Sequence, residues 1–152
     1  MKLRTIIITV FFLFYSKISA QFQPIYYVDY SYNNRHLIKG GLEFILIKNE
    51  EKQNNLFLGI GCGLVNNNKG IRGFPDLHLS YNIGTLLFVK AGSTDFHAYS
   101  LVGISFFNTC DLGIGYSYAY KNSQVEIEGF MIGATVRLTR RDNVYGKLKI
   151  GF

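Results

Sequence analysis

Apolar and polar positions alternate along most of the chain from Gln21 onward. Successive side chains of a β-strand point to opposite faces, so each alternating run predicts a strand with one apolar face. No stretch of helical length has apolar residues at a 3.6-residue period. The candidate strands number nine and span residues 25–32, 38–46, 56–64, 77–83, 85–92, 101–106, 112–120, 130–138 and 144–152.

Short polar segments separate these runs, which predicts an all-β fold, an antiparallel up-and-down β-barrel. The polar stretches 48–55 and 66–73 are expected to be loops. Single-chain barrels of the membrane type have an even number of strands, so either one of the nine runs is not a strand or a strand is split. The region 77–92 is the weakest, because Pro75 precedes it and Leu86 to Val89 are apolar without alternation. We predict eight strands, with ten as the alternative.

The two faces of the predicted strands differ in side-chain size as well as in polarity. The face opposite the apolar side chains consists mainly of Gly, Ala, Ser and Thr, and charged residues make up only 17% of the chain. A soluble barrel turns its apolar face inward, whereas a membrane barrel turns it outward and keeps small or polar residues in its narrow lumen. We therefore expect the apolar faces to contact lipid, with tyrosines such as Tyr26, Tyr32 and Tyr120 at the membrane interfaces. In the two runs 112–120 and 130–138, the lipid-facing residues are expected to be Tyr116, Tyr118, Phe130, Ile132 and Val136, and the lumen-facing ones Ser117, Thr135 and Arg137.

The first 20 residues have the layout of a secretory signal peptide. Lys2 and Arg4 precede an apolar run over 6–15, and a small residue, Ala20, stands before Gln21. The run is too short to cross a bilayer as a helix. We expect residues 1–20 to be removed on export and 21–152 to form a single β-barrel domain; a retained N-terminal anchor is the alternative.

Removal of the leader changes the charge of the chain. The full sequence has 16 Lys and Arg against 10 Asp and Glu, and the leader carries three of the basic residues and no acidic one. A net charge near +3 without a run of five or six like charges does not suggest a nucleic-acid partner.

The last run, 144–152, places Val144, Leu148, Ile150 and Phe152 on one face and ends in an aromatic residue. Together with the leader, this ending resembles small bacterial outer-membrane β-barrels. The resemblance implies a place in the outer membrane of a Gram-negative envelope, with lipid around the barrel. It also implies that barrel-assembly machinery reads the terminal strand, and an envelope protein partner is possible. On this basis we expect 144–152 to close the barrel by pairing with both 125–139 and the first strand, 25–32.

One pair of side chains has the chemistry of a nucleophilic site. His78 and Ser80 lie on the same strand face, which a His-activated serine would require, and the pair is similar to that of outer-membrane lipid A deacylases. Those enzymes add an orienting carboxylate, and the nearest downstream acids here, Asp95 and Asp111, lie in or beside turns. We therefore interpret His78 as a lumen-facing structural residue and expect no catalytic residue.

Other candidates also favour a structural interpretation. The glycine-rich stretch 59–63 lacks the spacing and the strand-to-helix setting of a dinucleotide site, so its glycines are expected to face a crowded lumen. We expect no cofactor, and no Cys/His spacing predicts a metal site. Cys62 is in phase with apolar neighbours, and a Cys62–Cys110 disulfide stays open at this point. The expected lumen charges, as a salt-bridged plug or as the lining of a narrow polar path, are Asp29, Lys39, Glu43, Arg137, Lys147 and Lys149.

Three functions fit this sequence. The first is an integral outer-membrane barrel with a structural, adhesion or assembly role and no chemistry. The second is an outer-membrane lipid hydrolase that uses His78 and Ser80. The third is an exported soluble barrel that carries an apolar ligand.

Overall fold

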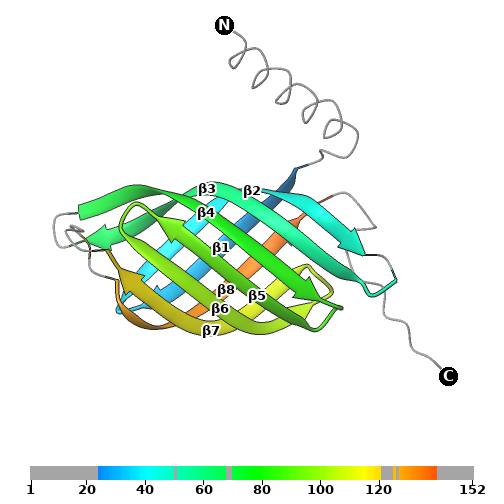
Figure 1. Cartoon of the computed structure of the whole chain (residues 1–152). Helices are drawn as coiled ribbons and strands as arrows, with labels where there is room; N and C mark the ends of the chain where they lie inside the picture. Colours follow the sequence, from blue (N-terminus) through cyan, green and yellow to red (C-terminus); the bar gives the residue numbers. More distant parts are fainter. Residues whose placement is uncertain (1–23, 50, 68–69, 121–124, 126, 140–152) are drawn as a thin grey trace, which may run out of the picture.

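The computed structural model describes residues 24–49, 51–67, 70–120, 125 and 127–139. These residues form a closed antiparallel barrel (Figure 1), as predicted. Among them there is no helix of the length and apolarity needed to cross a membrane. The eight strands are β1 (Ile25–Asn33), β2 (Arg35–Asn49), β3 (Asn54–Asn67), β4 (Gly70–Ile83), β5 (Leu87–Thr94), β6 (His97–Phe106), β7 (Cys110–Ala119) and β8 (Gly129–Leu138).

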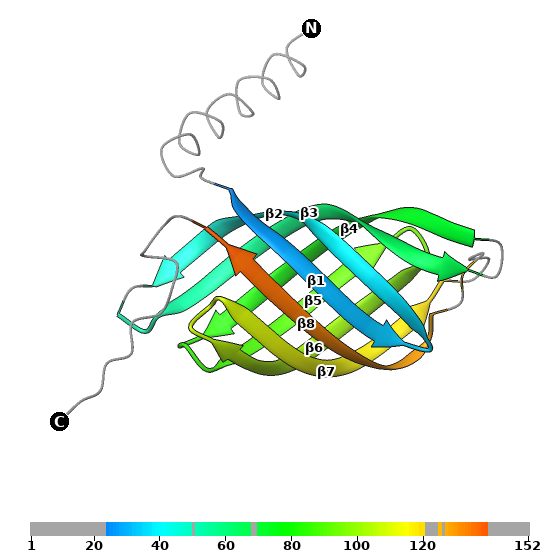
Figure 2. The same ribbon diagram turned by 180° about the vertical axis from the view of Figure 1, so that it is seen from behind.

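Each strand pairs with its neighbours in the sequence, and β8 closes the barrel on β1. The closing register runs from Tyr26 opposite Leu138 to Tyr32 opposite Ile132, and the two strands lie side by side in Figure 2. Because both edges of β1 and both edges of β8 are occupied, no further strand fits between them. The prediction that 144–152 closes the barrel is therefore wrong, and that segment itself lies outside the described residues.

The prediction that the surplus run lies within 77–92 is also wrong. The suspected region 77–92 contains two real strands, β4 and β5, joined by a turn at Gly84, whose φ of 61° suits glycine. Leu86 belongs to this turn, which explains why alternation fails there. Pro75 is tolerated because β4 pairs with β5 only from Asp76 onward, so its β5 side is an unpaired edge.

The loops are shorter than the polar composition suggested. β3 continues to Asn67 and β4 begins at Gly70, so the expected loop over 66–73 is mostly a paired hairpin. The stretch 48–55 is likewise reduced to a turn at 51–53. The polar residues of these two stretches therefore belong largely to paired strand ends.

We call the end of the barrel that holds the start of β1 and the end of β8 the terminal end, and the opposite one the distal end. The turns at 51–53, 84–86 and 107–109 lie at the terminal end, and the β1–β2 turn at Asn34 lies at the distal end. Five strands, β1 and β5 to β8, are 8 to 10 residues long. This is close to the roughly 9–11 residues that a tilted strand needs to cross a bilayer.

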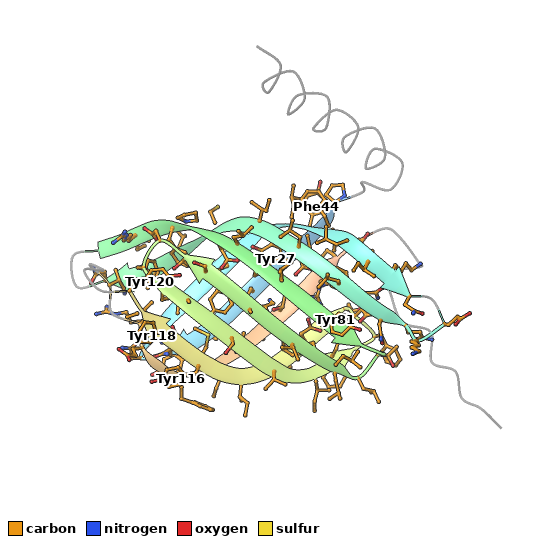
Figure 3. All side chains as sticks on the ribbon, viewed as in Figure 1. Tyr27, Phe44, Tyr81, Tyr116, Tyr118 and Tyr120 are labelled. Carbon is orange, nitrogen blue, oxygen red and sulfur yellow. The ribbon has the colours of Figure 1, made fainter. Side chains whose placement is uncertain are left out.

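Large apolar side chains cover the outer face, and the inner face carries polar and charged side chains together with a smaller set of apolar ones. On β1, Tyr26 is 61% exposed and its neighbour Tyr27 is 2% exposed. The inward and outward assignments made for β7 and β8 are confirmed: Phe130 and Ile132 are exposed, whereas Thr135 and Arg137 are buried. Side chains project from the outer surface all along the barrel in Figure 3. At one end of that view lie Tyr116, Tyr118 and Tyr120, and toward the other end Tyr81.

Candidate functional site in the barrel lumen

The centre of the lumen is a network of buried charged side chains. Each is at most 2% exposed, and together they come from β1, β2, β4, β5, β7 and β8. The barrel alternates inward and outward at every residue, so a charge in phase with the small polar residues is carried inside. The members of this lumen network are Asp29, Lys39, Glu43, Asp76, His78, Lys90, Asp111 and Arg137.

Arg137 joins two carboxylates near the terminal end. Its Nε and Nη2 both donate to Glu43, and Nη1 donates to Asp111. Nη2 also donates to Ser80 Oγ at 3.2 Å, and the guanidinium lies over the Phe57 ring, 4.6 Å from its centroid. The planar fork of arginine suits this two-point contact with a carboxylate. Arg137 therefore ties β8 to β2, β4 and β7 across the lumen.

Asp76 is the second centre of the network. Tyr99 Oη donates to it at 2.8 Å and Tyr27 Oη at 3.3 Å, while His78 Nδ1 lies 2.8 Å away. Lys39 Nζ lies 3.4 Å from the same carboxylate and 3.9 Å from the Tyr99 ring centroid. A buried carboxylate with this many donors is compensated for the loss of water.

Both lysines of the network contact the Asp29 carboxylate. Lys90 Nζ donates to its Oδ2 at 3.0 Å, and Lys39 Nζ lies 3.3 Å from its Oδ1. Thr135 on β8 donates to the same Oδ2 at 2.8 Å and accepts from Lys90 at 2.7 Å. Side-chain hydrogen bonds therefore join β1 and β8 in addition to the backbone pairing that closes the barrel.

His78 lies between two carboxylates of the network. Its Nδ1 faces Asp76 at 2.8 Å and its Nε2 faces Glu43 at 2.9 Å. The ring therefore bridges a carboxylate of β4 and a carboxylate of β2. The four carboxylates of the lumen network thus face Lys39, Lys90 and Arg137 together with the His78 ring.

His78 and Ser80 lie on the same inner face of β4, but each side chain is bonded to other partners. Both His78 nitrogens are occupied by carboxylates, and Ser80 Oγ contacts Asn82 at 3.3 Å and Arg137 at 3.2 Å. A carboxylate does contact the imidazole, because Asp76, two residues before His78, lies 2.8 Å from its Nδ1. Among the described residues His78 is hydrogen-bonded to the two carboxylates, and Ser80 to Asn82 and Arg137, rather than to each other. The geometry is that of an ion-pair bridge rather than an activated hydroxyl.

Strand β3 contributes no charged side chain to the lumen network, and its glycines leave room for side chains of other strands. An added Cβ at Gly59 would overlap the His78 ring, one at Gly61 the Tyr27 hydroxyl, and one at Gly63 the Phe74 ring. The glycine-rich stretch therefore makes room for large lumen side chains, which confirms its structural interpretation.

Apolar side chains lie on both sides of the lumen network along the barrel axis. At the distal end Leu37, Val65, Phe74, Phe96, Val125 and Ile127 form one buried cluster. Toward the terminal end Ile25 and Phe57 form another, with Ile45 packed against it. A salt-bridged plug, not an open polar path, is therefore what the described lumen contains.

The sequence identified five of the eight members of the lumen network, one of them His78. Asp29, Lys39, Glu43 and Arg137 are inside and paired as expected, whereas Lys147 and Lys149 lie outside the described residues. The members it missed are Asp76, Lys90 and Asp111. For two of them the signal was present, because Asp76 lies two residues before His78 and Asp111 two residues before Gly113, both predicted to face the lumen. Lys90 lies in the run 85–92, where alternation fails and no faces were predicted.

The cysteines and potential metal ligands form no site in the described part of the chain. Cys62 is exposed on the outer face, as its phase predicted, and Cys110 is partly exposed; both are free thiols, so the disulfide left open by the sequence does not form. No group of three or more His, Cys, Asp and Glu among the described residues could hold a metal ion.

Comparisons with protein-family models, with curated proteins and with solved structures gave no match. The class of the protein is defined by its fold, a closed eight-stranded antiparallel barrel with an apolar outer surface and an ion-paired lumen.

Proposed function

We propose that this chain is an integral outer-membrane β-barrel protein of a Gram-negative envelope. The observation that carries the proposal is the outer surface. Large apolar side chains more than a third exposed occur on every strand, from Tyr26 on β1 to Leu138 on β8. In water such a continuous surface would be strongly unfavourable, whereas hydrocarbon would solvate it. A closed barrel also satisfies its backbone hydrogen bonds internally, as a bilayer requires.

The contents of the lumen favour a structural, adhesion or assembly role without chemistry. The charges of the lumen network are paired, and apolar clusters lie on both sides of the network. Opening a path through it would separate buried ion pairs, which costs several kcal/mol for each charge left alone. The charges thus serve to tie six strands to each other.

The two alternatives receive less support from the geometry. A soluble carrier of an apolar ligand needs an apolar interior and a polar exterior, the reverse of this burial pattern. A lipid hydrolase needs His78 to activate Ser80, but each of the two side chains is held by other partners.

Membrane extraction tests the proposal. Expressed with its leader in a Gram-negative host, the protein should lose residues 1–20 and sediment with outer membranes. It should resist carbonate, dissolve only in detergent, and migrate faster on a gel before heating than after. Recovery of folded barrel in the periplasmic fraction would overturn the membrane assignment in favour of the carrier. An N-terminus that still carries Met1 would make the leader an anchor.

The proposed partners follow from this location. Outer-membrane lipid surrounds the barrel, and barrel-assembly machinery inserts it. Depletion of that machinery should leave the chain in the periplasm, whereas a barrel that still reached the membrane would have another route of insertion.

A further inference from the structure

The outer surface is not evenly convex. A groove of about 580 Å³ crosses β6, β7, β8 and β1, and its exposed lining is almost entirely apolar. Its walls include Tyr30 and Tyr32 of β1, Ile104 of β6 and Leu112 of β7, and Ala134 of β8 lies in its lining. A bilayer would present only hydrocarbon to such a surface, so the natural occupant of the groove is an apolar chain.

A row of glycines explains why the wall is hollowed here. Gly103 pairs with Gly113, and Gly113 pairs with Gly133, so three neighbouring strands lack an inward side chain at the same level. The wall can then approach the lumen contents closely. An added Cβ on Gly103 would overlap the backbone of Leu112, and one on Gly113 would meet the Phe88 ring at 2.6 Å. The groove on the outer surface therefore lies over the three glycines, which have no side chain on the inner face.

A polar hollow lies at the distal end, next to this groove. It has a volume of about 330 Å³ and is lined by Asn34, Arg35, His36, Asn66 and Asn67. The wall between the two is formed by tyrosines: Tyr30 Oη lies 2.6 Å from His36 Nδ1, and the Tyr32 and His36 rings are 4.9 Å apart. Arg35 is held in place by a bond from Nη1 to the Asn66 carbonyl, 3.0 Å.

We propose that the groove and the polar hollow together bind one membrane lipid with an anionic phosphate headgroup. The acyl chain lies in the groove, and the phosphate lies against Arg35 and His36. The charge of arginine and its N–H donors suit phosphate, and the adjoining tyrosines suit the boundary between headgroup and hydrocarbon. The inference rests on the proposed function, because only a membrane barrel offers this groove to lipid.

Native mass spectrometry of the detergent-purified barrel tests the inference. The probes are dioleoyl phosphatidylglycerol and the zwitterionic dioleoyl phosphatidylcholine. The wild-type chain should retain one phosphatidylglycerol in preference to phosphatidylcholine. Arg35→Gln should lower phosphatidylglycerol retention about tenfold, the loss expected for one charge-assisted contact. Ala134→Phe should fill the groove from outside and abolish retention of both lipids.

Ala91→Phe is the matched control. Ala91 is also small and outward-facing but lies on β5, away from the groove, so this variant should bind as the wild type does. Heat-dependent gel migration shows separately that every variant is folded. Equal retention of the two probes, or unchanged retention in Ala134→Phe, would overturn the inference. A dimer that Ala134→Phe dissociates would also overturn it, because the occupant would then be a second copy. These results are scored on folded barrel in detergent, so they are distinct from a failure of membrane fractionation.

Discussion

Arg137 and Glu43 form a two-point ion pair across the lumen, although 94 residues separate them in the sequence. Both side chains are 0% exposed. Removal of one partner from a buried pair leaves an uncompensated charge, which is more costly than the pair itself is stabilising. This relationship decides where the barrel is most sensitive to substitution.

Arg137→Met should destabilise the barrel by about 3–5 kcal/mol, because Glu43 and Asp111 both lose their ion pair with Arg137. Urea unfolding of the refolded protein in detergent micelles would measure this. Arg72→Met is the control, since Arg72 pairs with Asp95 at 2.7 Å but both side chains are about one-third exposed. An exposed pair contributes roughly 0–1 kcal/mol. Equal losses in the two variants would contradict the assignment of Arg137 to a dry lumen.

The interior glycines make a second prediction possible. Gly61→Ala should cost about 1–3 kcal/mol, because the new methyl group would overlap the Gly40 carbonyl and the Tyr27 hydroxyl. Gly73→Ala is the matched control, because its nearest neighbour would be the Gly63 carbonyl at 3.9 Å. Thermal unfolding of both variants in the same detergent provides the comparison. Equal thermal stability of Gly61→Ala and Gly73→Ala would mean that the lumen is less tightly packed than its contacts indicate.

The outer surface gives a third prediction. Ile132→Arg should cost about 2–4 kcal/mol if Ile132 lies near the bilayer midplane, because the charge would face hydrocarbon. Ile71→Arg should cost roughly 0–1 kcal/mol, since Ile71 lies in the hairpin at the distal end and is 77% exposed. Reversible folding into lipid vesicles would measure both. If the two variants were equally stable in vesicles, the outer surface would not be in lipid.

Ser80→Ala separates the structural role from the hydrolytic one. Loss of the hydroxyl removes contacts to Asn82 and Arg137, so stability should fall by about 1 kcal/mol. Mass spectrometry of lipid A from cells that express the variant should match that from cells with the wild-type chain. A change in acylation that requires Ser80 would revive the hydrolase hypothesis and contradict our assignment of the network.

The alternation of the sequence was sufficient to predict the barrel and its inside-out burial. Ser117 and Thr135, for example, lie inside as their phase requires. Strand phase depends on local geometry alone, which is why it could be predicted. The choice of closing strand could not, because the pairing of β1 with β8 joins segments about 100 residues apart.

The lumen network was predicted only in part for a similar reason. The phase of Asp29 and Arg137 placed both inside, but their partners depend on how the strands are staggered around the barrel. The contact of Lys90 with Asp29, across 61 residues, follows from closure and register together. Neither the closure of the barrel nor the register of its strands can be predicted from a local stretch of sequence.

The C-terminal stretch supplies the last prediction. Every described strand is already paired on both edges without residues 140–152, so removal of Gly151 and Phe152 breaks no pair of the described barrel. The truncated chain should therefore refold in detergent with the heat-dependent gel migration of the full chain. If the aromatic ending is the signal that barrel-assembly machinery reads, the same truncation should fail to assemble in cells and be degraded in the periplasm.

Phe152→Tyr is the control for this truncation, because it keeps an aromatic residue at the end and should assemble normally. Comparing refolding in vitro with insertion in cells separates two roles for this stretch. A truncated chain that fails to refold in detergent would show that the barrel itself depends on the stretch. A truncated chain that reaches the outer membrane at the wild-type level would show that the assembly signal lies elsewhere.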